Sequence, residues 1–118
     1  MDHSTTGSLI SSSDVNGTDV YGRTGDKVGQ IDHLMIDKQS GKVAYAVMHF
    51  GGFLGIGEDE HPVPWQKLDY DTSKDGFVTD ITEEQLKGAP ERGTNWRTDR
   101  DWEKRTHDYY AVTPYWGM

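Results

Sequence analysis

Residues 42–70 read KVAYAVMHFGGFLGIGEDEHPVPWQKLDY, and this stretch decides the fold. Its first part carries apolar side chains on both alternating faces of an extended chain, with Val43, Tyr45 and Val47 on one face and Ala44, Ala46, Met48 and Phe50 on the other. A strand that is covered on both sides belongs at the centre of a small β structure. The pattern therefore predicts a central strand over residues 43–50.

A glycine-rich loop and a short proline-bounded segment follow this strand. The four glycines of the loop are Gly51, Gly52, Gly55 and Gly57, and they allow positive φ angles and sharp bending. A phosphate-binding role is disfavoured, because no Lys-Ser or Lys-Thr pair and no helix pattern follow the glycines. Val63, Pro64 and Trp65 then read as a short strand that ends beside a large aromatic residue.

The arrangement resembles the PRC-barrel family. The segments that carry the resemblance are Gly22–Gly29, Ile31–Ile36, Lys42–Phe50, the glycine loop, Val63–Trp65 and Leu86–Pro90. The resemblance implies a small, strongly bent β-barrel, as in the cytoplasmic part of the photosynthetic reaction-centre H subunit and the C-terminal domain of RimM-type ribosome maturation factors. It implies no catalytic residues and no cofactor, because those relatives use the barrel to hold something larger.

Local patterns add detail to this mainly β fold of about six short strands. The alternation of apolar residues slips between Ile31 and Leu34, which predicts a β-bulge near Asp32 and His33. Residues 66–70 read as another short strand. A capping-box pattern at Thr82 predicts a short helix near 83–88, and Thr98 or Asp99 can cap a second helix near 99–110.

Composition divides the chain into three expected parts: a flexible amino terminus (1–8), the barrel domain (9–91) and an aromatic tail (92–118). Residues 1–91 carry 7 basic and 16 acidic side chains, a net charge of −9, whereas the tail carries 5 and 4. An acidic barrel repels phosphate backbones, so nucleic acid is a poor partner. The absence of cysteine, of a signal-peptide pattern and of a long apolar run favours a bacterial cytoplasmic protein without membrane insertion.

The tail holds six of the thirteen aromatic residues of the chain and forms the candidate interaction surface. These residues are Trp96, Trp102, Tyr109, Tyr110, Tyr115 and Trp116. On the expected helix, Trp102, Thr106 and Tyr109 share a face at i, i+4 and i+7. Such a face can cover its own barrel, pack on a second subunit or receive a partner, and the first two alternatives are favoured because a large exposed apolar patch promotes aggregation.

Catalytic and metal-binding patterns are weak. No histidine pair has the i, i+4 spacing of helical metal ligands, and no nucleophile-elbow motif surrounds a serine. The run Glu58 to His61 offers oxygen ligands, but neighbouring side chains on a strand point to opposite faces, so a solvated acidic edge is favoured. His49 continues one face of the central strand and is expected to be a hydrogen-bonded barrel histidine. We expect no enzyme, no metal and no catalytic residue.

These observations favour a non-enzymatic protein-binding or adaptor module with an unidentified protein partner. The alternative is a sensor of a small molecule or metal ion that uses the barrel mouth and the Glu58–His61 edge. A ribosome-maturation module is disfavoured by the acidic charge. Short edge strands and spare aromatic surface also predict a homodimer or small homo-oligomer.

Overall fold

The computed structural model describes residues 9–53 and 60–117 and shows a mainly β fold. The strands are β1 (Asp19–Tyr21), β2 (Lys27–Ile36), β3 (Val43–His49), β4 (Glu60–Pro64), β5 (Leu68–Asp71) and β6 (Gly76–Thr79). The α-helices are α1 (Ser12–Val15), α2 (Glu83–Gly88) and α3 (Arg100–Tyr110). The described residues also form three 3-10 turns: η1 (Trp65–Lys67), η2 (Trp96–Thr98) and η3 (Tyr115–Gly117).

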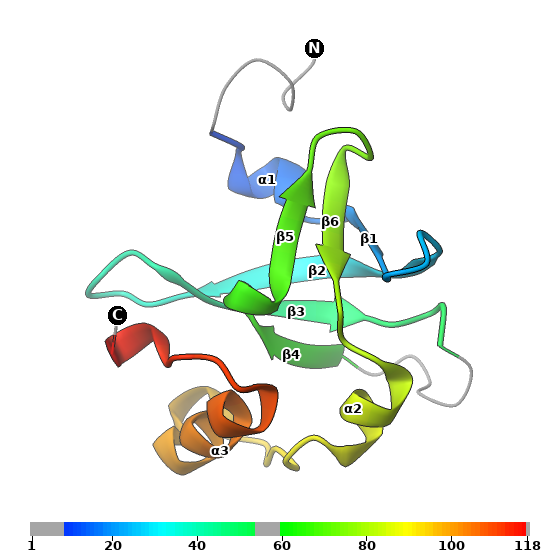
Figure 1. Cartoon of the computed structure of the whole chain (residues 1–118). Helices are drawn as coiled ribbons and strands as arrows, with labels where there is room; N and C mark the ends of the chain where they lie inside the picture. Colours follow the sequence, from blue (N-terminus) through cyan, green and yellow to red (C-terminus); the bar gives the residue numbers. More distant parts are fainter. Residues whose placement is uncertain (1–8, 54–59, 118) are drawn as a thin grey trace.

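The six strands form one curled sheet in the order β4-β3-β2-β1-β6-β5. Neighbouring strands are antiparallel except β1 and β6, which pair in parallel. Because the sheet bends sharply, β5 and β6 rise steeply from β2 and β3 (Figure 1). A half-barrel results, and α3 lies beside β4 (Figure 1).

The central strand is covered on both faces, as its sequence predicts. Ala46 and Met48 of β3 are buried in the main core, which extends from Val15 to Tyr110. Ala44 and Tyr45 belong to a second apolar cluster that includes Trp102 of the tail. β3 is therefore the strand that contacts both the barrel interior and the carboxy-terminal segment.

Local signals place several elements as predicted. The register between β2 and β3 shifts between Ile31 and His33, so the predicted bulge at Asp32 is confirmed. Thr82 and Gln85 form a reciprocal capping box at the start of α2. Asp99 caps α3 by accepting a hydrogen bond from the Trp102 N–H at 3.1 Å.

Two details of local structure differ from what the sequence suggests. The segment after Pro64 begins with the 3-10 turn η1, and β5 starts only at Leu68. Gly51 and Gly52 do not adopt a positive φ. Gly52 instead allows a close approach of two backbones, because a Cβ there would lie 2.5 Å from the Lys27 carbonyl oxygen. Gly55 and Gly57 lie outside the described residues.

Candidate functional site

The tail helix α3 packs against its own barrel rather than standing apart from it. Trp102, Thr106 and Tyr110 are buried on the face toward the barrel, and Tyr110 joins the main core. The predicted third member of this face was wrong, since Tyr109 keeps 38% of its surface exposed. Tyr109 instead lies at the edge of the interface, where its hydroxyl donates to the Gln85 carbonyl oxygen at 2.7 Å.

Tyr45 of β3 is the aromatic centre of this interface. Its ring centroid lies 5.4 Å from that of Trp102, 6.3 Å from Trp96 and 6.1 Å from Tyr115. The Trp96 and Tyr115 rings meet it edge-on, which is a favoured geometry for aromatic pairs. One strand residue therefore holds three separate parts of the tail: η2, α3 and η3.

A buried carboxylate strengthens the same interface. Glu103 is 7% exposed and accepts hydrogen bonds from the hydroxyls of Tyr45 at 2.9 Å and Tyr115 at 2.6 Å. Arg100 pairs with it at 3.1 Å. Burial, together with the nearby Glu103 charge, raises the pKa of Tyr45, and burial is the main cause that raises the pKa of Tyr115 to about 12. Both hydroxyls thus remain donors at neutral pH, and the buried charge is satisfied.

The outer end of the interface remains partly open to solvent. The Arg100 guanidinium lies 3.8 Å from the ring centroid of Trp116, which is 38% exposed. His107, one turn after Glu103, is buried, and its Nδ1 lies 2.7 Å from the Glu103 carbonyl oxygen. Arg100 therefore links the buried carboxylate to the exposed aromatic end of the chain.

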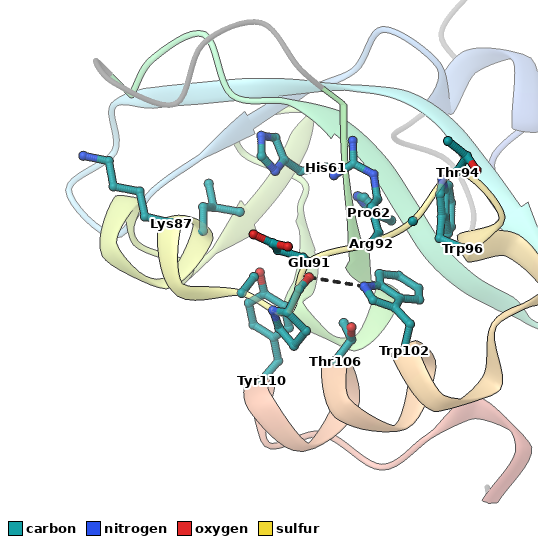
Figure 2. A pocket seen from close by; sticks show the side chains of 14 residues that line it. His61, Pro62, Lys87, Glu91, Arg92, Thr94, Trp96, Trp102, Thr106 and Tyr110 are labelled. Carbon is teal, nitrogen blue, oxygen red and sulfur yellow. Dashed lines mark hydrogen bonds between the residues drawn. The ribbon is translucent and has the colours of Figure 1, made fainter.

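A groove of about 650 Å³ lies beside the contact between α3 and the barrel edge. Its walls come from β4, from α2, from the linker that follows α2 and from α3 (Figure 2). The lining residues are His61, Pro62, Leu86, Lys87, Ala89, Pro90, Glu91, Arg92, Gly93, Thr94, Trp96, Trp102, Thr106 and Tyr110. This volume lies within the range of pockets that take drug-sized molecules, about 300–1,000 Å³.

Thr106 forms the polar part of the groove floor. Figure 2 shows its side chain between Trp102 and Tyr110 on the α3 side of the groove. The residue is 2% exposed, and its Oγ1 has no hydrogen-bond partner among the described residues. Trp102 is satisfied in contrast, because its Nε1–H donates to the Pro90 carbonyl oxygen at 3.3 Å. Buried hydroxyls nearly always have a partner, so this oxygen is the notable polar group of the groove.

Charged side chains border the groove. Lys87 pairs with Glu83 at 3.1 Å, and both lie on α2. Arg92 donates a hydrogen bond to the Glu60 carbonyl oxygen of β4, which ties the linker to the barrel edge. Glu91 is exposed. The groove therefore combines an aromatic floor with a rim of mixed charge.

The six tail aromatics fall into three groups. Trp96, Trp102 and Tyr110 line the groove, whereas Tyr115 packs on Tyr45. Tyr109 and Trp116 are the exposed members.

Of the predicted family motif, Val63 and Pro64 are fully buried. Trp65 packs edge-on against Phe77 with ring centroids 5.3 Å apart.

Sequence reasoning missed two elements of this site. It did not identify Tyr45 as the residue on which the tail docks, and it did not predict that Glu103 is buried. The docking role of Tyr45 could have been recognised, because its large ring lies on a strand with apolar residues on both faces. No local signal marks Glu103, because a charged residue on a helix is exposed in most proteins.

A group able to hold a metal ion lies apart from the groove lining. Asp32, His33 and Glu60 offer ligand atoms that all lie within 4.8 Å of one another. Glu60 belongs to the acidic run considered in the sequence, but its partners come from β2 rather than from its chain neighbours. Glu58 and Asp59 lie outside the described residues.

The fold agrees with a comparison against protein families. A family model described as PRC-barrel domain matches residues 8–86. The chain therefore belongs to the PRC-barrel family. No match is found among curated proteins. Within residues 9–53 and 60–117, no helix combines the length and apolar character needed to cross a bilayer.

Proposed function

We propose that this PRC-barrel chain is a non-enzymatic binding module that holds a short segment of a partner protein in the groove beside α3. The observation that carries the proposal is the buried Thr106 hydroxyl without a partner on the groove floor. A bound segment can supply the missing polar group while it packs an apolar side chain on Trp102 and Tyr110. Aromatic rings with a central polar contact are typical of binding hot spots.

The same floor supports binding rather than catalysis. A hydroxyl nucleophile needs a general base within hydrogen-bond distance, and Thr106 Oγ1 has none among the described residues. Trp102 Nε1 is already occupied by the Pro90 carbonyl oxygen. We therefore propose an adaptor role without enzymatic activity.

A small-molecule sensor is the second candidate, and the groove volume of about 650 Å³ favours it. Native mass spectrometry of the purified protein distinguishes the two functions. A bound compound of low mass supports a sensor, whereas a stoichiometric complex with a polypeptide supports an adaptor.

Site-specific photo-crosslinking in the native cell tests the adaptor role. A photoreactive phenylalanine analogue replaces Thr94, which is exposed and lines the groove. The matched control replaces Thr72, an exposed residue of the turn between β5 and β6. We expect one protein to be crosslinked from position 94 and not from position 72. Identical crosslinking patterns at the two positions would contradict a partner site in the groove.

The proposal includes a cytoplasmic location and a homodimer or small homo-oligomer. β4 and β5 are the two edge strands of the sheet, and Trp116 and Tyr109 expose aromatic surface. Edge strands and exposed rings both favour association. Analytical sedimentation measures the oligomeric state directly. A monomer mass that does not vary with protein concentration would contradict self-association.

A further inference from the structure

The β-bulge in β2 brings chemically complementary side chains together on the sheet. In a regular strand, neighbouring residues point to opposite faces. At this bulge Ile31 is fully buried, whereas Asp32 and His33 meet each other with Oδ2 and Nδ1 2.6 Å apart. The bulge therefore removes the geometric objection to metal binding by residues adjacent in sequence.

Two further side chains reach this pair from β3 and β4. His49 Nε2 lies 3.4 Å from Asp32 Oδ1, and Glu60 Oε2 lies 3.9 Å from His33 Nδ1. His49 and Glu60 are directly opposite each other in the β3–β4 register. Three neighbouring strands thus present two imidazoles and two carboxylates to one small region of the sheet.

We propose that Asp32, His33 and Glu60, with His49 as fourth ligand, form a binding site for a divalent transition-metal ion of the Zn²⁺ type. Imidazole and carboxylate ligands in a four-coordinate set suit Zn²⁺, which binds them at about 2.0–2.2 Å. Ligand atoms around such an ion lie roughly 3–3.5 Å apart. The separations of 2.6 Å and 3.9 Å bracket that value, so Asp32, His33 and Glu60 need only small side-chain rotations. His49 lies 3.4 Å from Asp32 but outside this group of three, so its ring must turn toward the ion to supply the fourth ligand.

The charge of the group fits the same ion. Two carboxylates with two neutral imidazoles neutralise a divalent cation. The four side chains are between 30% and 45% exposed, which leaves the ion accessible to solvent and exchangeable.

The site is adjacent to the groove but does not depend on it. The Glu60 carbonyl oxygen accepts the hydrogen bond from Arg92, and His61 lines the groove wall. A metal ion on the Glu60 carboxylate therefore holds the β4 residue to which the groove linker is attached. The metal site can be tested without any knowledge of the groove partner.

Calorimetric titration of the full chain with ZnCl₂, after removal of metal by a chelator, tests the proposal. We expect saturable binding of one ion per chain. The variants His33→Ala and Glu60→Gln should each weaken the affinity about tenfold or more. The variant His3→Ala should retain it, and this control removes a histidine that could bind metal near the amino terminus.

Thermal melting in excess EDTA supplies the second measurement. His33→Ala should melt at the wild-type temperature under these conditions, because the site is exposed and the fold does not require the ion. Added Zn²⁺ should raise the melting temperature of the wild type but not of His33→Ala. No saturable binding, or equal affinity in the wild type and both cluster variants, would overturn the proposal.

Discussion

Thr106→Val is expected to stabilise the protein, although it removes a polar group from a helix that packs on the barrel. The Thr106 hydroxyl is buried and lacks a partner among the described residues, and such a group costs about 1–3 kcal/mol. Valine replaces it with a methyl group, and valine and threonine have similar helix propensities. Because the groove is open, we expect a gain near the lower limit, about 1 kcal/mol in the free energy of unfolding.

The matched control is Thr79→Val, at a residue that is equally buried. The Thr79 hydroxyl donates to the Lys67 carbonyl oxygen at 2.7 Å and accepts from the Ile81 N–H at 3.2 Å. Loss of both hydrogen bonds should destabilise the protein by about 1–3 kcal/mol. The same chemical change is thus expected to have opposite signs at the two positions.

Urea unfolding followed by circular dichroism measures both free energies by linear extrapolation. A destabilisation of Thr106→Val comparable to that of Thr79→Val would refute the reasoning, because the hydroxyl would then be satisfied in the free protein. If the hydroxyl serves a ligand, Thr106→Val should also reduce crosslinking from position 94. Stability would then increase while binding decreases, as is common at functional sites.

Three further predictions concern the tail and the glycine loop. Trp102→Ala should destabilise the protein by about 3–5 kcal/mol and expose the tail to protease, and unchanged proteolysis would count against docking of this ring. Gly52→Val should cost about 1–3 kcal/mol because its Cβ would meet the Lys27 backbone, whereas Gly51→Ala, which meets nothing within 4 Å, should be tolerated in the same melting experiment. Burial raises the pKa of Tyr115 from 10.0 to about 12. The neutral Tyr115 hydroxyl therefore stabilises the folded protein fully below pH 10, and this contribution to the free energy of unfolding is lost as the pH rises toward 12. Tryptophan fluorescence should report the unfolding at high pH, and Tyr45→Phe should reduce the loss of stability.

Much of the fold could be predicted because its signals are local. Residues 43–50 carry apolar side chains on both faces, and this pattern correctly predicted a strand that is buried on both faces. The break in the alternation of apolar residues near Asp32 correctly predicted a bulge. The capping box at Thr82 fixed the start of α2. The parallel pairing of β1 with β6 carries no comparable signal, since it joins segments that are far apart in the sequence.

The buried face of α3 was only partly predictable. Apolar spacing placed Trp102 and Thr106 correctly but chose Tyr109 in place of Tyr110. At about 100° per residue, the buried arc extends from Trp102 across Tyr110 to Glu103 and His107. Glu103 and His107 are not apolar, so the pattern of apolar residues centres the face about 60° too far toward Tyr109. In this orientation Glu103 accepts hydrogen bonds from Tyr45 and Tyr115, which compensate for its burial.

The proximity of Asp32, His33 and Glu60 was not predicted, for a related reason. Adjacent residues were assumed to diverge, as they do in a regular strand. That assumption holds for Glu60 and His61 but fails at the bulge, where Asp32 and His33 meet. The predicted bulge was therefore the available signal, and its effect on side-chain direction was the missing step.

Amide hydrogen exchange over residues 100–110 tests most directly whether the tail is a fixed wall of the groove. The packing of Trp102, Glu103 and Tyr110 on the barrel predicts slow exchange for the hydrogen-bonded amides of α3 in the isolated protein. Protection comparable to that of the β3 amides would support a preformed groove. Complete exchange of α3 within seconds, while β3 stays protected, would contradict it.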